Sequence, residues 1–465
     1  MSPRIILLAL FIFACFRFII SPKHDIHRFH YILLSSMIQS LMIYPLLYIW
    51  IQIPEKTRNP EFCAPFENNI GILYPTIISL IIYLSANRKR AFYWKQISFS
   101  LFSIIALFLY SFISPYNFSR LSTIICLLLF VQIFFVVYVL KRCIHPTLFL
   151  NAVYDGFKII IIAEAIISIP FVFFNVDSLQ ALFYSSETDV GEFVREGTMY
   201  KYASGTMTQH NRLGALCSYI SLFYLSCLIF KYKRNQSIFL FITSILVLIL
   251  SQSRSAIIAT LFASCFIIYT YLKKMRVLSF GKFWLFVSIS AVVAILLLNT
   301  DLIYSMFFNS NVDDMSVARQ IHYFLGWDML QKNNFLGTGI NSHVHYLYNN
   351  MMSGRYNLFF FINSIHNIHL VIFVETGIVG ICLWLYFIFS RIKRFLMAPL
   401  VSMKNPIICF VFIAMIVTII IWGFTDYALL HFQYLILLFL FGAMYGYKDE
   451  YKSFMRTTPK TNRQK

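Results

Sequence analysis

Charged residues are scarce in this chain of 465 residues, in which Asp, Glu, Lys and Arg together make up 12%. Hydrophobic residues account for 59% and aromatic residues for 18%. A soluble domain carries about 25% charged residues, because its surface must face water. The composition therefore excludes an ordinary soluble protein and predicts an integral membrane protein.

Other features of secreted or modular chains are also missing. Internal repeats, Gly-Ser linkers and low-complexity tracts are absent, and of the nine cysteines only Cys63 falls in an expected outward loop, so a disulfide framework is not expected. The first apolar run, at residues 4–20, is followed by Pro22 and Lys23 and not by a small-residue cleavage site. We therefore expect a retained span and not a signal peptide.

Long apolar runs fill most of the chain, and each has close to the ~20 residues that a helix needs to cross ~30 Å of hydrocarbon. A membrane β-barrel is excluded, because its strands would alternate apolar and polar residues. The sequence predicts an all-α polytopic bundle of about 12 to 13 transmembrane helices. The expected spans are residues 4–20, 31–51, 70–86, 97–113, 121–140, 156–174, 212–230, 238–253, 256–272, 281–299, 368–389, 406–424 and 428–446.

Lys and Arg gather in every second connection between these runs, which predicts that those connections face the cytoplasm. The net charge of +19 follows from this topology, and no nucleic-acid partner is expected. We expect one transmembrane domain over residues 1–446, a basic cytoplasmic tail at 447–465, and two long outward loops at about 175–211 and 300–367. Loops of that length inside a compact bundle are usually functional. The basic segments are 88–95, 141–142, 231–234, 273–282 and 391–404.

The polar residues that interrupt the apolar pattern all fall at outward ends of the expected spans. Arg254 is the most informative, because a positive charge on the outer side opposes the bias of the other loops. An arginine at a membrane boundary can also be an interfacial anchor, but a bound anion explains this position better. The other outward polar residues that we single out are Asn211, Arg212, Arg319, His366, Asn367 and Asp426.

The order and spacing of these groups resemble a known family. The pattern runs from Asn211-Arg212-x-Gly through Ser-Gln-Ser-Arg254 and Arg319 to Asn-Phe-Leu-Gly-Thr-Gly at 334–339, and then to His366-Asn-x₇-Glu-Thr-Gly-Ile-Val-Gly. It is similar to the O-antigen ligase and O-antigen polymerase superfamily of bacterial inner membranes, over about residues 200–390. The proline usual before the glycine motif of the large loop is replaced here.

The resemblance implies an all-helical glycosyltransferase of the C type whose active site faces the periplasm. Its two functional arginines and its histidine would be Arg254, Arg319 and His366, and Asp426 would match an acidic residue between the final spans. We assign Asn211, Arg212, Asn367 and Asp426 to substrate binding.

The chemistry of a lipid-linked donor agrees with these residue types. Transfer of a glycan from undecaprenyl pyrophosphate builds negative charge on the leaving pyrophosphate, and guanidinium groups bind phosphate oxygens bidentately. The acceptor hydroxyl must lose a proton, which a histidine with an ordinary pKa near ~6.5 can accept. Arg254 and Arg319 would bind the pyrophosphate, and His366 would be the general base. No cofactor is expected.

Two alternative readings concern metal and packing. His343, His345, His366 and His369 gather in the outer segment, but no Cys, Asp or Glu completes a ligand spacing, so no metal site is expected. His366 could instead be structural, beside Asn367 as a helix N-cap. Glu164 and Lys158 lie inside one span and could form an internally satisfied pair, so they are left out of the site.

These observations predict an O-antigen ligase of the bacterial inner membrane whose acceptor is a sugar of the lipid A core. An O-antigen polymerase that joins lipid-linked repeats is the nearest alternative, and a protein-directed oligosaccharyltransferase is a third. The non-enzyme alternative is a polysaccharide flippase, which should carry charged residues near the bilayer midplane on several broken helices. The candidate groups here are outward only, which favours the enzyme.

Overall fold

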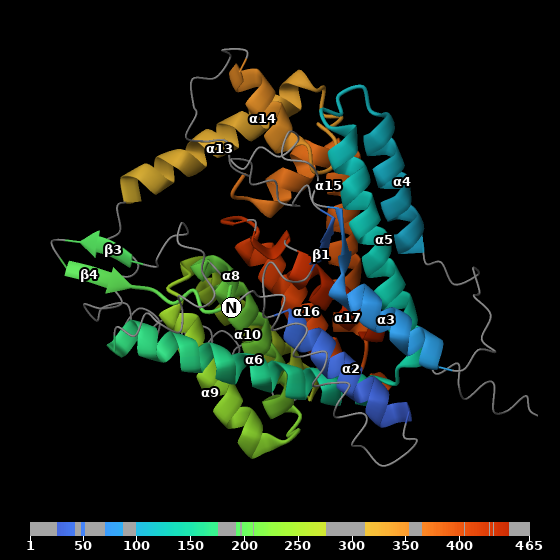
Figure 1. Ribbon diagram of the computed structural model, residues 1–465, viewed down its shortest axis with the longest axis vertical. Coiled ribbons are helices and arrows are strands. Elements are labelled where there is room, and N and C mark those ends of the chain that lie inside the picture. Colours follow the sequence, from blue (N-terminus) through green and yellow to red (C-terminus); the bar gives the residue numbers. More distant parts are fainter. Residues whose placement is uncertain are drawn as a thin grey trace, which may run out of the picture.

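A computed structural model describes most of the chain, and the described part is almost entirely helical (Figure 1). The described residues are 26–41, 48–51, 70–86, 99–174, 192–195, 198–207, 209–275, 312–352, 365–403, 405–426, 428–430 and 432–445. The helices are α2 Ile26–Ser40, α3 Tyr74–Ser85, α4 Phe99–Ile113, α5 Arg120–Cys143, α6 Pro146–Phe174, α8 His210–Ile229, α9 Arg234–Leu250, α10 Arg254–Lys274, α13 Val312–Lys332, α14 His343–Met352, α15 Ile368–Met397, η4 Leu400–Ser402, α16 Pro406–Trp422, η5 Ala428–Leu430 and α17 Phe432–Tyr445.

The predicted all-α polytopic membrane fold is confirmed. Within the described ranges, α5, α6, α8, α10 and α15 are long and apolar enough to cross a membrane, and α3, α9 and α16 are among the shorter apolar helices. The expected runs at 4–20 and 281–299, Cys63 and the basic tail lie outside the described residues. The count of about 12 to 13 spans therefore stays a prediction.

Two of the expected spans differ from the structure. The run at 31–51 contains α2 followed by strand β1 Tyr48–Ile51, and the run at 70–86 begins with strand β2 Ile70–Leu73 before α3. The two strands pair antiparallel. Proline explains the start of α3, because Pro75 is favoured in the first turn of a helix. A second hairpin, β3 Glu192–Arg195 with β4 Thr198–Lys201, lies in the first long loop.

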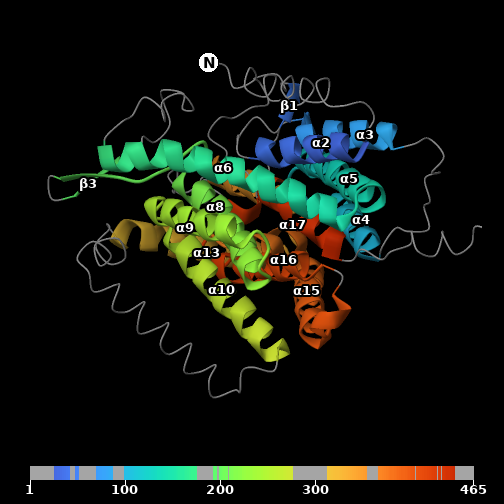
Figure 2. The same ribbon diagram turned by 90° about the horizontal axis from the view of Figure 1, so that it is seen from below.

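The core of the bundle surrounds α16. Its side chains are buried on all faces from residue 407 to residue 419, as expected for a helix that is apolar all round. Figure 2 shows α2, α3 and α6 on one side of the molecule and α10 and α15 on the other, with α16 and α17 between them. Asn405 caps the start of α16 by accepting a hydrogen bond from the Ile408 amide.

The long helix α15 is interrupted at Gly377, whose φ of 64° and ψ of −163° only glycine adopts readily. The loop after α13 inserts at this break. Ile378 N donates to Phe335 O at 3.0 Å, Thr338 N to Val374 O at 2.8 Å, and Gly339 N to Glu375 O at 3.0 Å. Backbone groups freed by the break are therefore bonded again, as the interior of a membrane protein requires.

Candidate functional site

The first group of candidate residues lies where α8 and α10 begin. Asn211 is in the first turn of α8, and its Oδ1 accepts a hydrogen bond from Ser253 Oγ at 2.9 Å. Ser253 is the N-cap of α10, whose first residue is Arg254. The helices approach closely, because a Cβ added at Gly214 would lie 2.6 Å from the Ser253 Cβ. The structure therefore brings Asn211 and Arg212 together with Arg254.

A buried carboxylate holds the segment that leads into α8. Glu164 on α6 is 0% exposed and accepts hydrogen bonds from the Thr206 amide, at 3.1 Å, and from the Thr206 hydroxyl. Gly205, the residue before Thr206, has a φ of 55°, and a side chain at this position would overlap the Glu164 carboxylate. Glu164 thus accepts its hydrogen bonds from Thr206 of the Gly-Thr motif. The packing pair with Lys158 that the sequence suggested does not provide them.

The second group surrounds His366, which lies two residues before α15. Its Nδ1 lies 3.9 Å from Asp426 Oδ1, with the two side chains 35% and 7% exposed. This distance exceeds a hydrogen bond but is within ion-pair range once the imidazole is protonated. The ring also stacks on that of His322, with centroids 5.5 Å apart and planes tilted by 23°. His322 is 3% exposed and was not singled out from the sequence.

The helix α13 brings Arg319 towards this second group. The backbone of Arg319 belongs to α13, three residues before His322 and hence about one helical turn away, while its side chain lies outside the described part of the chain. Gly326 lets α13 pack closely on α15, because an added Cβ would lie 2.9 Å from Leu370 Cδ2. Tyr323 OH donates to Phe424 O at 2.7 Å, which ties α13 to the turn after α16.

Asn367 has a structural role in this group. Its Oδ1 accepts a hydrogen bond from the Leu370 amide at 2.9 Å, so it is the N-cap of α15. Its side chain is thereby committed to the helix start, and the substrate-binding role assigned to it remains a prediction. The cap fixes the backbone next to His366.

The turn between α16 and α17 contacts both groups. On one side, Ile368 N donates to Gly423 O at 2.7 Å, close to Asp426. On the other, in the first turn of α17, Tyr434 OH donates to Arg212 O at 2.5 Å, and Gln433 Nε2 lies 3.7 Å from Met207 Sδ. The turn and the first residues of α17 therefore adjoin the start of α15 and the start of α8.

The far ends of α10 and α15 also lie together. Lys274, the last residue of α10, donates from Nζ to Phe395 O at 2.8 Å and to Leu396 O at 3.2 Å near the end of α15. The last turns of the two helices are therefore in direct contact. The contacts of the α16–α17 region with the starts of α8 and α15 place Arg254, beside Asn211, and His366 on the same side of the bundle. That this side faces the periplasm stays a prediction.

The four histidines of the outer segment do not converge. His343 contacts Glu375, His366 stacks on His322, and His369 accepts from Trp384 Nε1 at 3.1 Å. Burial lowers the pKa of His345, and the neighbouring His343 lowers it further. Within the described ranges, no three His, Cys, Asp or Glu residues form a group that could hold a metal ion.

The arrangement can support proton transfer and anion binding at one end of a membrane bundle. A partly exposed imidazole next to a buried carboxylate can accept a proton and be stabilised as a cation. Arg254, at a helix N-terminus that itself favours anions, can bind phosphate oxygens.

Comparison with known protein families identifies part of the chain. Residues 239–385 match the family described as O-Antigen ligase, which supports the predicted relationship to the O-antigen ligase and polymerase superfamily and an activity of the membrane glycosyltransferase type. The matched range contains Arg254, Arg319 and His366, and it ends before Asp426. No curated protein matches the chain.

Proposed function

Because residues 239–385 match the O-Antigen ligase family, we propose that this protein moves a preassembled glycan from undecaprenyl pyrophosphate to a sugar hydroxyl of the lipid A core. The reaction takes place on the periplasmic side of the inner membrane. The observation that carries the proposal is the placement of His366 against Asp426 and His322, at the bundle end where Arg254 begins α10.

In the proposed reaction the acceptor hydroxyl oxygen forms a bond to the anomeric carbon of the donor glycan. The bond from that carbon to the pyrophosphate oxygen breaks, and its electron pair leaves with undecaprenyl pyrophosphate. His366 takes the hydroxyl proton at Nε2, because Nδ1 is the nitrogen that faces Asp426 at 3.9 Å. Asp426 stabilises the imidazolium that forms, and a positioned base of this kind contributes ~10²–10⁴ in rate.

Arg254 and Arg319 bind the leaving pyrophosphate in this scheme. A guanidinium stays charged at any physiological pH and offers a fork of donors that matches phosphate geometry. Loss of one donor to a developing charge typically costs ~3 kcal/mol, or ~10²-fold in rate. Asn211 and Arg212 lie beside Arg254 through the Ser253 contact and would hold the same end of the donor.

The surroundings of the site favour a lipid-linked donor over a soluble one. Phe324 and Trp327 on α13 are 69% and 50% exposed, and Phe424 in the turn next to Asp426 is 56% exposed. Exposed aromatic side chains of this kind are common where a protein meets the apolar part of a membrane. An isoprenoid chain can lie against them while its pyrophosphate is held at the arginines.

A transfer assay in vesicles tests the proposal. Purified protein is supplied with an undecaprenyl-pyrophosphate glycan and a lipid A core acceptor, and the rate is measured per folded molecule. His366→Ala should lower the rate by about 10²–10⁴-fold. The matched control is His145→Ala, in the turn between α5 and α6, where His145 Nδ1 lies 2.8 Å from Thr147 Oγ1.

Three results would count against the proposal. Full activity of His366→Ala removes this residue as the base. Glycan lengthening on the donor lipid alone, without transfer to the core acceptor, identifies a polymerase. Movement of the intact donor across the bilayer with no bond broken identifies a flippase.

A further inference from the structure

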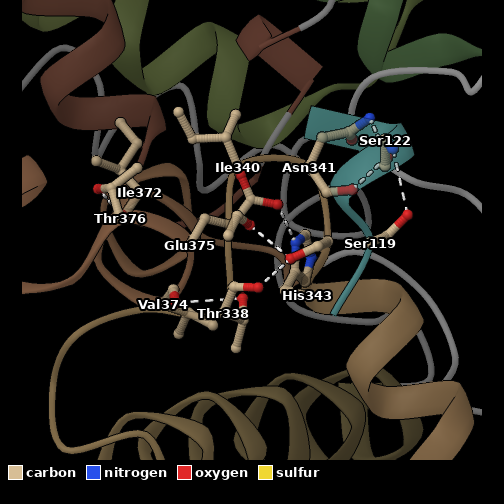
Figure 3. Close-up of polar contacts among 12 residues, drawn as sticks. Ser119, Ser122, Thr338, Ile340, Asn341, His343, Ile372, Val374, Glu375 and Thr376 are labelled. Atoms are coloured by element: carbon tan, nitrogen blue, oxygen red, sulfur yellow. Dashed lines mark hydrogen bonds and ion pairs between the residues drawn. The ribbon is translucent and has the colours of Figure 1, made fainter. Parts of the chain in front are cut away.

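Glu375 and His343 form a buried contact that the proposed reaction does not use. Glu375 Oε1 lies 2.7 Å from His343 Nδ1, and the side chains are 4% and 0% exposed. Glu375 stands two residues before the break in α15, and His343 is the first residue of α14 (Figure 3). Ionisable groups buried inside a membrane bundle cost free energy unless they are paired, and they usually serve function.

The contact belongs to a larger assembly, which we call the α15 joint: residues 333–343 after α13, together with residues 374–378 around the break. Its three glycines, Gly337, Gly339 and Gly377, all have positive φ and leave no room for side chains. A Cβ at Gly337 would lie 2.6 Å from Glu375 O, and one at Gly377 would lie 2.6 Å from Leu336 C. The segments 334–339 and 375–380, distant in sequence, are therefore two halves of one packed unit.

The α4–α5 hairpin holds the outer face of the joint. Ser122 Oγ donates to Asn341 O at 2.6 Å, and Thr123 Oγ1 donates to Ile340 O at 2.8 Å (Figure 3 shows Ser122, Ile340 and Asn341). Ser111 Oγ accepts from Ile340 N at 2.7 Å. These hydrogen bonds fix residues 340–341 to the α4–α5 hairpin. A contact that holds α15 against residues 333–343 therefore also holds α15 in place relative to the hairpin.

Two of the elements that position candidate catalytic residues, α13 and the first part of α15, end in the joint. The helix α13, which contains Arg319, runs directly into it, with Phe335 N donating to Leu330 O at 2.8 Å. The first part of α15, residues 368–376, begins next to His366 and ends in the joint. Because Gly377 interrupts the helix, the second part of α15 does not set the direction of the first part.

We propose that Glu375 and His343 are positioning residues, whose contact keeps the α15 joint closed and so sets His366 against α13 and Arg319. The catalytic consequence rests on the function proposed above. A reacting group displaced by about 1 Å can lower a rate about 10²-fold, so a remote contact of this kind can control transfer.

The activity test uses four variants and one control. Glu375→Leu and His343→Leu each break the contact, and the double variant removes both polar groups, so that no buried polar partner is left unsatisfied. Glu375→Gln is a milder change that keeps the volume and a hydrogen bond. The control is Asp155→Asn, which alters the contact of Asp155 with Tyr31 and Lys233 at the opposite end of the bundle.

Each leucine variant should lower kcat per folded molecule by about 10²-fold with KM little changed. The double variant should be no slower than the slower single variant, because the two residues act as a unit. Glu375→Gln should keep more of the rate than Glu375→Leu, and Asp155→Asn should keep all of it. Normal kcat in the double variant would overturn the inference.

A second measurement follows the position of residue 366 without relying on transfer. His366→Cys is labelled in intact cells with a membrane-impermeant maleimide, and labelling of the chain with native His366 is subtracted. Adding the Glu375→Leu/His343→Leu change should raise the labelling rate, because the face that stacks on His322 becomes accessible. An unchanged rate would overturn the inference. If labelling rises but even the unaltered chain transfers no glycan, the proposed function is wrong and the positioning role stands.

Discussion

Replacement of Gly377 by alanine tests the break in α15 on which the account of the site depends. At a φ of 64° and ψ of −163°, a non-glycine residue carries strain of about 1–3 kcal/mol. The added Cβ would also lie 2.6 Å from Leu336 C and closer still to Phe335 O, so the loop must move away. The Ile378-to-Phe335 hydrogen bond at 3.0 Å and at least one neighbouring bond are then lost, each worth about 1 kcal/mol.

The expected loss in the free energy of unfolding is therefore about 3–5 kcal/mol. Chemical unfolding of the purified protein in detergent measures it. Gly442→Ala is the control, because its Cβ would meet only the Phe412 ring, at 3.0 Å, and alanine favours the helical conformation. Equal stability of the two variants would refute the described conformation at Gly377.

Three further predictions concern other parts of the molecule. Gly205→Ala should reduce the amount of folded protein, measured by size-exclusion chromatography, and Glu164→Ala in the same chain should restore part of it by removing the overlapping carboxylate; no restoration would contradict the contact. Arg254→Lys should transfer glycan more slowly per folded molecule, because a point charge cannot replace a bidentate fork, and a native rate would favour the interfacial-anchor alternative. Gln320→Cys should react with an impermeant thiol reagent in intact cells and Lys393→Cys only after permeabilisation; the reverse pattern would invert the topology.

Much of the fold could be predicted because a helix is the simplest structure for an apolar run in lipid. The runs at 212–230 and 256–272 correspond to α8 His210–Ile229 and α10 Arg254–Lys274. Composition could not predict the break in α15, because apolar residues predominate on both sides of Gly377 and glycine is common in transmembrane helices. Composition also could not predict the strands β1 and β2, because β-branched and aromatic residues occur both in strands and in apolar membrane helices.

The candidate site was only partly accessible from the sequence. His366 and Asp426 could be chosen because each interrupts an apolar pattern at an outward end, and the structure places them 3.9 Å apart. The partners of buried polar residues could not be predicted, because they come from distant segments. His343 contacts Glu375 from 32 residues away, and Thr206 bonds to Glu164 from 42 residues away.

The central claim is that one glycan leaves undecaprenyl pyrophosphate for each glycan gained by the acceptor. The most direct test is product analysis of a vesicle reaction with purified protein, a labelled undecaprenyl-pyrophosphate glycan and lipid A core. The account predicts equal amounts of glycan on the core and of free undecaprenyl pyrophosphate, both strongly reduced in His366→Ala and Arg254→Ala. Glycan on the core without release of the pyrophosphate lipid, or yields in the two variants equal to those of the native protein, would contradict it.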